Sequence, residues 1–231
     1  MNDLDLPDIP GGWVARDVIV AERVFDLLLP GHPDAFLNSV DPVTTRATDE
    51  RTTYWQYLWP AAIDMAQLVL RADWKPDQAA LELGAGIGLV GVAALAAGLN
   101  VTFSDCDSVA VRIALTNARR NGFATATGLL LDWRAPVARR FPVILASDVL
   151  YRPENVEPLL RVIDEMLDDD GVCWIGDPGR PAVRDFVQRA SDAGFEVRLR
   201  DANGGDALFP PVDRFVLVEL RRGGMWLLPR T

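Results

Sequence analysis

The chain has 231 residues, 49% of them hydrophobic, which is enough for one sizeable α/β domain plus an extension rather than two full domains. Its formal net charge of −10 argues against a nucleic-acid partner, which would need a basic surface. An acidic surface favours encounters with a basic partner, and the equally weighted alternative is that the charge only keeps the protein soluble. The two cysteines are far apart, which predicts a cytoplasmic protein without disulfides, and a single histidine makes a metal site hard to build. The acidic N-terminus does not resemble a signal peptide, and the lack of an apolar run of about 18 residues predicts no membrane span.

The N-terminal part of the sequence is its least regular part. Residues 14–19 and 24–29 are apolar enough for two strands, although no turn signal separates them, and the polar residues 41–53 predict a loop. We interpret residues 1–58 as an extension or cap that does not fold independently, and residues 59–231 as the main domain.

Farther along, strands alternate with helices. An aromatic cluster at residues 54–60 leads into a predicted helix at residues 61–70, with Pro60 acceptable in its first turn. Strands are predicted at residues 79–84, 101–104, 128–131, 143–146 and 172–175, helices at 87–99, 108–121, 154–167 and 182–193, and a closing antiparallel pair at 195–199 and 214–220. This alternation indicates an α/β fold with a mostly parallel sheet, in which ligands bind at the carboxyl ends of the strands.

The most informative segment is Glu82-Leu83-Gly84-Ala85-Gly86-Ile87-Gly88, between the first of these strands and the following helix. Glycines spaced by two let a ligand approach bare backbone, because a side chain would block it or demand a strained φ. The helix N-terminus behind the turn offers unpaired N–H groups to a carboxylate or phosphate. An acid inside a buried strand is costly unless it has a partner.

Two cofactor classes use such a turn. The spacing G-x-G-x-x-G is typical of dinucleotide-binding folds. In this chain Leu89 stands where the third glycine of that motif would fall, so an NAD-dependent oxidoreductase is a minor alternative. The tighter G-x-G-x-G preceded by Glu82 resembles motif I of the class I S-adenosylmethionine-dependent methyltransferases. The resemblance implies a seven-stranded, doubly wound, Rossmann-like sheet with an antiparallel C-terminal strand, and S-adenosylmethionine as cofactor with S-adenosylhomocysteine as product. It implies that Glu82 contacts the methionine ammonium, directly or through water, beside a turn formed by Gly84, Ala85, Gly86 and Gly88.

The ends of the next two strands supply further candidate cofactor residues. Asp105 can accept hydrogen bonds from ribose hydroxyls. Asp107 is the alternative, but we favour it as a charge at the start of the following helix, for which Ser108 is the candidate N-cap. Asp132 can accept from an adenine amino group and Trp133 can cover the ring; a loop acid and a core tryptophan are equally weighted alternatives.

Asp148 and Tyr151 follow the fourth predicted strand, three residues apart, and can face one pocket. Asp148-Val149-Leu150-Tyr151 matches the D-x-x-Y signature of the seven-strand protein lysine methyltransferases, to which Asp132-Trp133 and the aromatic-Trp-Pro segment are also similar. The hypothesis is that Asp148 orients the acceptor amine and Tyr151 shapes the slot, while Trp59 and Ser147 line the cofactor pocket. The alternatives are a helix cap for Asp148 and a core aromatic for Tyr151.

The resemblance extends over residues 54–190. Gly176-Asp177-Pro178-Gly179-Arg180-Pro181 looks like a segment of the lysine methyltransferases of the electron-transfer-flavoprotein β subunit. Asp177 and Arg180 could shape the substrate mouth, but we favour an internal ion pair. Trp59-Pro60-Ala61-Ala62 departs from the Trp-Pro-Gly-Gly of those enzymes, so their substrate is not carried over.

These residues predict a methyltransferase that acts on the amine of a protein lysine. The alternatives are a small-molecule amine as acceptor and a protein that binds the cofactor without turnover. A nucleic-acid methyltransferase is disfavoured by the acidic charge balance and by the lack of an Asn/Asp-Pro-Pro-aromatic tetrapeptide.

Overall fold

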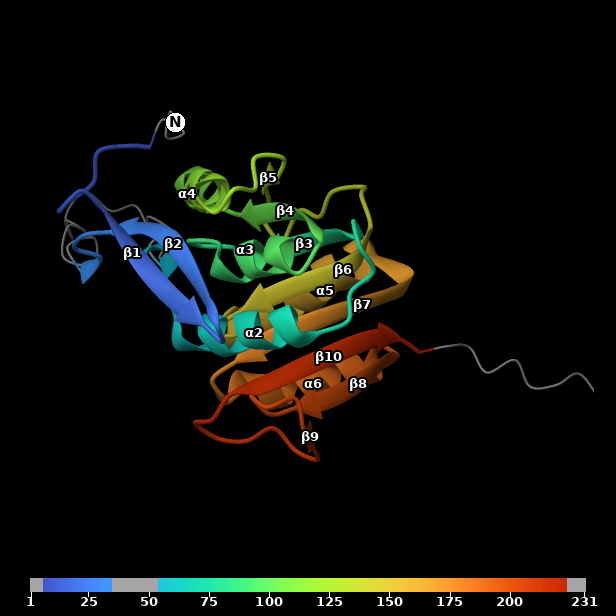
Figure 1. The fold of residues 1–231 in the computed structure, drawn as a ribbon. Helices are drawn as coiled ribbons and strands as arrows, with labels where there is room; N and C mark the ends of the chain where they lie inside the picture. The colour runs from blue at the N-terminus through green and yellow to red at the C-terminus, as the bar shows by residue number, and fades with distance from the viewer. Residues whose placement is uncertain (1–5, 35–53, 224–231) are drawn as a thin grey trace, which may run out of the picture.

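The centre of the molecule is a sheet with the strand order β5-β4-β3-β6-β7-β10-β8-β9 (Figure 1). The computed structural model describes residues 6–34 and 54–223, so the predicted loop at residues 41–53 lies outside the described residues. The strands are β3 (Ala79–Leu83), β4 (Asn100–Asp105), β5 (Thr127–Leu130), β6 (Phe141–Ser147), β7 (Leu167–Asp177), β8 (Phe195–Arg200), β9 (Asp206–Ala207) and β10 (Val216–Arg222).

The pairing of the strands confirms a mostly parallel sheet with an antiparallel C-terminal strand. β3 pairs in parallel with β4 and β6, β4 with β5, and β6 with β7, whereas β10 runs antiparallel between β7 and β8. Seven of these strands correspond to the expected ones. The eighth, β9, contributes only two residues just after the Asn203-Gly204-Gly205 turn, and they pair with β8 at this edge of the sheet.

Helices cover both faces of the sheet. On one face lie α2 (Pro60–Arg71), α3 (Leu89–Ala96) and α4 (Ser108–Arg120), and on the other lie α5 (Val156–Met166), preceded by the short 3-10 helix η2 (Pro153–Asn155), and α6 (Ala182–Asp192) (Figure 1). The layers follow from the sequence, because the apolar residues of α5 recur at helical spacing and are buried. Within the described part of the chain, no helix is both long and apolar enough to cross a lipid bilayer.

The N-terminal segment contributes a separate antiparallel hairpin of β1 (Trp13–Val20) and β2 (Arg23–Pro30). Ala21 adopts φ +54° in its two-residue turn, a conformation usually left to glycine or asparagine, which explains why the sequence carries no turn signal there. The buried Asn117 of α4 attaches the hairpin to the domain: its amide oxygen accepts from Leu28 N (2.7 Å), and its nitrogen donates to Leu28 O and Ile87 O. The division at residue 58 remains a prediction.

The N-cap of α4 differs from the one expected. Asp107 has an extended backbone and its carboxylate accepts a 2.7 Å hydrogen bond from Val109 N, so Asp107, and not Ser108, caps the helix. Ser108 is the first helical residue. The capping role agrees with the preference for Asp107 as a helix-terminal charge over a ribose ligand.

Candidate active site

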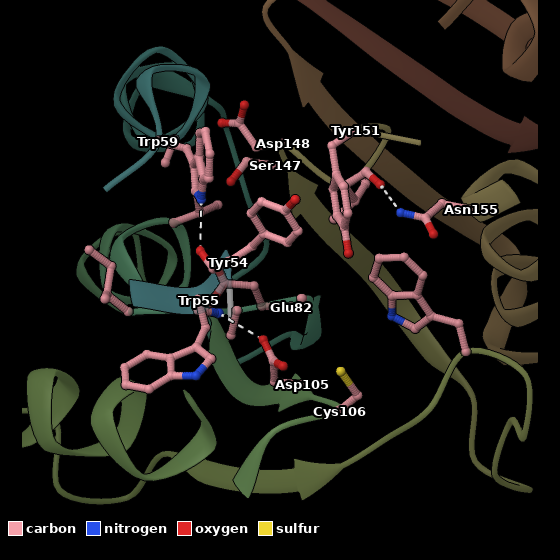
Figure 2. A pocket seen from close by; sticks show the side chains of 18 of the residues that line it. Tyr54, Trp55, Trp59, Glu82, Asp105, Cys106, Ser147, Asp148, Tyr151 and Asn155 are labelled. Carbon is pink, nitrogen blue, oxygen red and sulfur yellow. Dashed lines mark hydrogen bonds between the residues drawn. The ribbon is translucent and has the colours of Figure 1, made fainter. Parts of the chain in front are cut away.

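A pocket with a cavity of about 310 Å³ opens at the carboxyl ends of β3, β4 and β6 (Figure 2). Segment 54–59 forms its opposite wall. The predicted site residues that line it are Trp59, Glu82, Gly84, Ala85, Gly86, Asp105, Asp132, Trp133, Ser147, Asp148 and Tyr151. The parallel sheet brings them together because strands that run the same way end at the same edge.

The glycine turn has the backbone that its sequence requires. Gly84, Gly86 and Gly88 have φ of +64°, +52° and +82°, all in the left-handed region that favours glycine. A Cβ on Gly86 would lie 3.3 Å from the carbonyl oxygen of Trp55. Gly88 lies behind the pocket wall, where a Cβ would come within 2.7 Å of Ala114 Cβ.

Gly88→Ala should therefore lower the free energy of unfolding more than Gly98→Ala. Both glycines have strongly positive φ, so both substitutions carry a backbone cost of about 1 kcal/mol. Only at Gly88 does the new methyl group also meet a neighbouring element, whereas nothing lies within 4 Å at Gly98. We expect Gly88→Ala to cost roughly 1–3 kcal/mol more, as overpacking typically does, measured by urea denaturation. Equal losses in the two variants would contradict the close approach of α4.

Glu82 is buried under the turn, with 2% of its surface exposed. Its carboxylate lies against α3 at Gly91, where a Cβ would be only 2.4 Å from Glu82 Oε2, so glycine is needed there to make room. Among the described residues Oε2 has no hydrogen-bond partner. Burial raises the pKa of the Glu82 carboxyl to about 8, assisted by the charge of Asp105 and opposed by the Gly91 N–H. A buried acid with an unsatisfied oxygen fits a ligand that brings its own cation.

Asp105 is held by the backbone at the end of β4. Its Oδ2 accepts from Gly86 N (3.1 Å) and its Oδ1 from Asp107 N (3.0 Å), which fixes the carboxylate across the glycine turn. An ionised carboxylate can accept about four hydrogen bonds, so this one retains capacity for a ligand's hydroxyls. Burial raises the pKa of Asp105, and it raises the pKa of the adjacent Cys106 thiol to about 12, which makes that thiol a poor nucleophile at neutral pH.

Asp132 and Trp133 line the pocket after β5. Asp132 is exposed and its Oδ1 accepts from Arg134 N (3.0 Å), which forms a tight loop. Trp133 is half-buried, and its ring lies 3.2 Å from where a Gly84 Cβ would be. The ring therefore borders the same glycine turn that Glu82 and Asp105 surround.

At the other end of the pocket, Asp148 follows β6 with φ +58°, and its N–H donates to Gly176 O (2.9 Å). Its Oδ1 accepts from Arg180 Nη2 (2.7 Å), while its Oδ2 is buried without a hydrogen-bond partner among the described residues. Arg180 also pairs with Asp177, at 2.9 Å. The expected internal ion pair is thus present, but it has a third member, Asp148, that the sequence did not reveal.

Aromatic rings separate the two ends of the pocket. Tyr54 packs against Tyr151, with ring centroids 5.1 Å apart, and against Trp59 at 6.2 Å, while Trp59 Nε1 donates to Tyr54 O (3.0 Å). Figure 2 shows Glu82 and Asp105 toward one end and Ser147 and Asp148 toward the other, with Tyr54 between them. Sequence reasoning treated Tyr54 and Trp55 only as the approach to α2, although the density of rings before Pro60 was the available signal.

The described residues contain no group of three or more histidine, cysteine, aspartate or glutamate side chains placed to hold a metal ion. Glu82 and Asp105 are close enough for the charge of Asp105 to raise the pKa of Glu82, whereas Asp148 lies toward the other end of the pocket (Figure 2). Of the predicted site residues, only Gly88 lies outside the lining.

Comparison with known proteins places this geometry in context. Residues 45–191 match a family described as lysine methyltransferase. The chain is 31% identical over 115 residues to "Histone-arginine methyltransferase METTL23" of Homo sapiens (46% of this chain, 60% of that protein). It is 28% identical over 146 residues to "Protein-lysine methyltransferase METTL21E" of Bos taurus (56% and 50%). The chain spans about half the length of the curated relatives it matches.

Among solved structures, the fold is similar to that of a TehB-like SAM-dependent methyltransferase from Corynebacterium glutamicum, with a TM-score of 0.57 and 20% identity over 69% of this chain and 87% of that one. At this identity the likeness establishes the fold, a Rossmann-like methyltransferase sheet.

Proposed function

Because this chain belongs to the lysine methyltransferase family, we propose that it transfers a methyl group from S-adenosylmethionine to the side-chain amine of a protein lysine. The observation that carries the proposal is one pocket with two buried, incompletely bonded carboxylates at its two ends, Glu82 and Asp148. One suits a cofactor that carries an ammonium group, and the other suits an acceptor with an N–H.

The cofactor end fits S-adenosylmethionine, which supplies an electrophilic methyl group on its sulfonium. Glu82 would accept from the methionine ammonium, and Asp105 from the ribose hydroxyls. Asp132 would accept from the adenine amino group and Trp133 would cover the ring. Trp59 and Ser147, with the bare backbone of the glycine turn, would complete the wall. The unsatisfied Oε2 of Glu82 and the left-handed turn support this arrangement.

The acceptor end is the region around Asp148 and Tyr151. Asp148 Oδ2 would accept a hydrogen bond from the incoming amine and fix its line of approach, which is the main task in a displacement on an activated methyl group. The rings of Tyr54 and Tyr151 would enclose the aliphatic part of the side chain and exclude water. Burial raises the pKa of Tyr151, so its hydroxyl stays neutral and can donate.

Other acceptors are alternatives for the same pocket. A small-molecule amine is one alternative, and binding without turnover is another. The relatives' names include histone-arginine and histidine protein methyltransferases. The guanidinium of a protein arginine and the imidazole of a protein histidine are therefore further alternative acceptors. We propose a basic protein partner on the grounds of the net charge of −10, with no nucleic-acid or membrane partner. Both cysteines are free, which suits the proposed cytoplasmic location.

One assay separates these acceptors. The protein is incubated with methyl-labelled S-adenosylmethionine and a cell lysate, and the lysate is fractionated into protein and small molecules. Acid hydrolysis of the labelled protein then identifies the modified amino acid by chromatography. We expect label in protein, recovered as methyllysine. Label only in the small-molecule fraction, or none above a boiled-enzyme control, would contradict the proposed function.

A further inference from the structure

Arg180 bridges two buried carboxylates at the acceptor end of the pocket. Its Nη2 lies 2.7 Å from Asp148 Oδ1 and its Nη1 lies 2.9 Å from Asp177 Oδ2. The side chains of Asp148 and Asp177 are 4% and 0% exposed, whereas that of Arg180 is 23% exposed and lines the pocket. Two buried acids and one cation leave this cluster with one net negative charge.

The backbone holds both acids in place. Asp177 Oδ1 accepts from Gly179 N (2.9 Å) and Arg180 N (2.8 Å), which turns the chain back so that the guanidinium reaches across to Asp148. Asp148, in a left-handed conformation, is tied to β7 through its N–H bond to Gly176 O. The cluster therefore joins the ends of two neighbouring strands, and Arg180 has little freedom to leave either acid.

The consequence for Asp148 is a carboxylate with one oxygen hydrogen-bonded and the other without a hydrogen bond. Oδ1 is engaged by Arg180, while Oδ2 is buried and has no hydrogen-bond partner among the described residues. A guanidinium is recognised by a carboxylate through two parallel N–H bonds, one to each oxygen. An amine presents its hydrogens from a single nitrogen and needs only one oxygen.

We propose that Arg180 is a positioning residue that leaves Asp148 with one unbonded oxygen and so selects an amine over a guanidinium as the methyl acceptor. The inference rests on the proposed function and deepens it. Arg180 acts through Asp148: it fixes the plane of that carboxylate, leaves Oδ2 as the oxygen without a hydrogen bond, and favours the ionised form beside a second buried acid.

The charged and polar groups that face Asp148 are Arg180, Asp177 and the Ala61 N–H at the N-terminus of α2. Burial and the charge of Asp177 raise the pKa of Asp148, while Arg180 and the Ala61 N–H lower it. Removal of the Arg180 charge should therefore raise the pKa of Asp148 further. Asp148 would then take up its proton at a higher pH, and the acid limb of the pH–rate profile would move upward.

The test measures initial rates of methyllysine and methylarginine formation in lysate protein from pH 6 to 9, with S-adenosylhomocysteine affinity measured in parallel by calorimetry. The variants are Arg180→Gln, Arg180→Lys, and Arg180→Gln combined with Asp177→Asn. Arg189→Gln is the matched control, because Arg189 forms an exposed ion pair with Asp185 on α6, outside the pocket.

We expect Arg180→Gln to lower methyllysine formation about tenfold or more at pH 7 and to shift the acid limb upward, with S-adenosylhomocysteine affinity within about threefold of wild type. Adding Asp177→Asn removes the second acid and should return the limb toward wild type. Arg180→Lys keeps the charge, so the acid limb of its pH–rate profile should stay near the wild-type position, although the rate of methyllysine formation falls. Arg189→Gln should match wild type throughout.

Several results would overturn the inference without touching the proposed function. They are a methylarginine-to-methyllysine ratio in Arg180→Gln no higher than in the wild type, an unshifted acid limb in that variant, or a shift that Asp177→Asn fails to reverse. If Arg180→Gln does not fold, as judged by lost S-adenosylhomocysteine binding, the acid limb of the pH–rate profile is measured in Arg180→Lys instead. A large upward shift of that limb despite the retained charge would contradict the positioning role of Arg180. Absence of labelled protein with the wild type would instead contradict the proposed function itself.

Discussion

Asp148→Asn should reduce methyl transfer by at least about a hundredfold while changing the affinity for S-adenosylhomocysteine by no more than a few-fold. Asparagine keeps the size of the side chain and an oxygen for Arg180 Nη2, but it removes the charge and puts an NH₂ group in place of Oδ2. The acceptor N–H would then meet a donor instead of an acceptor. The cofactor end of the pocket, built on β3 and β4, is unchanged.

The measurement pairs initial rates in lysate with calorimetry on the same preparation. Asp185→Asn is the matched control, since Asp185 is a half-exposed acid on α6 that pairs only with Arg189 among the interactions described. If Asp148→Asn turned over within about threefold of wild type, Asp148 would not orient the acceptor. If it lost S-adenosylhomocysteine binding as well, Asp148 would belong to the cofactor end.

The second large effect concerns the pH dependence of cofactor binding. With the pocket empty, burial holds the pKa of Glu82 at about 8, so the carboxyl is mostly protonated at pH 6.5 and must lose that proton to pair with an ammonium. Glu82 thus carries a proton in the ligand-free protein and none in the complex. The affinity for the cofactor must therefore rise with pH up to about 8. We expect S-adenosylhomocysteine affinity to increase by nearly tenfold between about pH 6.5 and 7.5.

Glu82→Gln should remove this dependence and weaken binding at pH 8 by about 10–100-fold, the usual range for a lost charge-assisted hydrogen bond. The control ligand is 5′-methylthioadenosine, which shares the nucleoside but lacks the amino-acid group, so its affinity should depend little on Glu82. The control variant is Glu219→Gln, which changes another buried acid far along the sheet, paired with Arg200 and Arg221. Equal pH slopes for the two ligands would contradict the pairing of Glu82 with the ammonium.

Local patterns predicted the elements that carry most of this site. The glycine turn, the strand-helix alternation and the strand-end acids depend on residues close in sequence, and the parallel sheet then forces the strand ends to one edge. The hairpin turn at Ala21 was invisible because alanine rarely adopts a left-handed φ. The cap of α4 was displaced by one residue because Asp107 and Ser108 are both good N-caps and only backbone geometry decides between them.

The acceptor end was harder to predict because its contacts are tertiary. Arg180 meets Asp148 across 32 residues of sequence, and no local pattern distinguishes that contact from the shorter pairing with Asp177. Likewise, the ring of Tyr54 reaches Tyr151 only because α2 and β6 are neighbours in the folded domain. The roles given to these residues toward cofactor and acceptor remain predictions.

The strand order places the two halves of the pocket on either side of the boundary between β3 and β6. The glycine turn and Asp105 come from β3 and β4, whereas Asp148, Asp177 and Arg180 come from β6, β7 and the loop after β7. The two groups of residues thus lie on neighbouring halves of the sheet, which adjoin where β3 pairs with β6. We expect that exchanging the loops after β6 and β7 would change the proposed acceptor preference and leave the proposed nucleoside-binding residues of β3 and β4 in place.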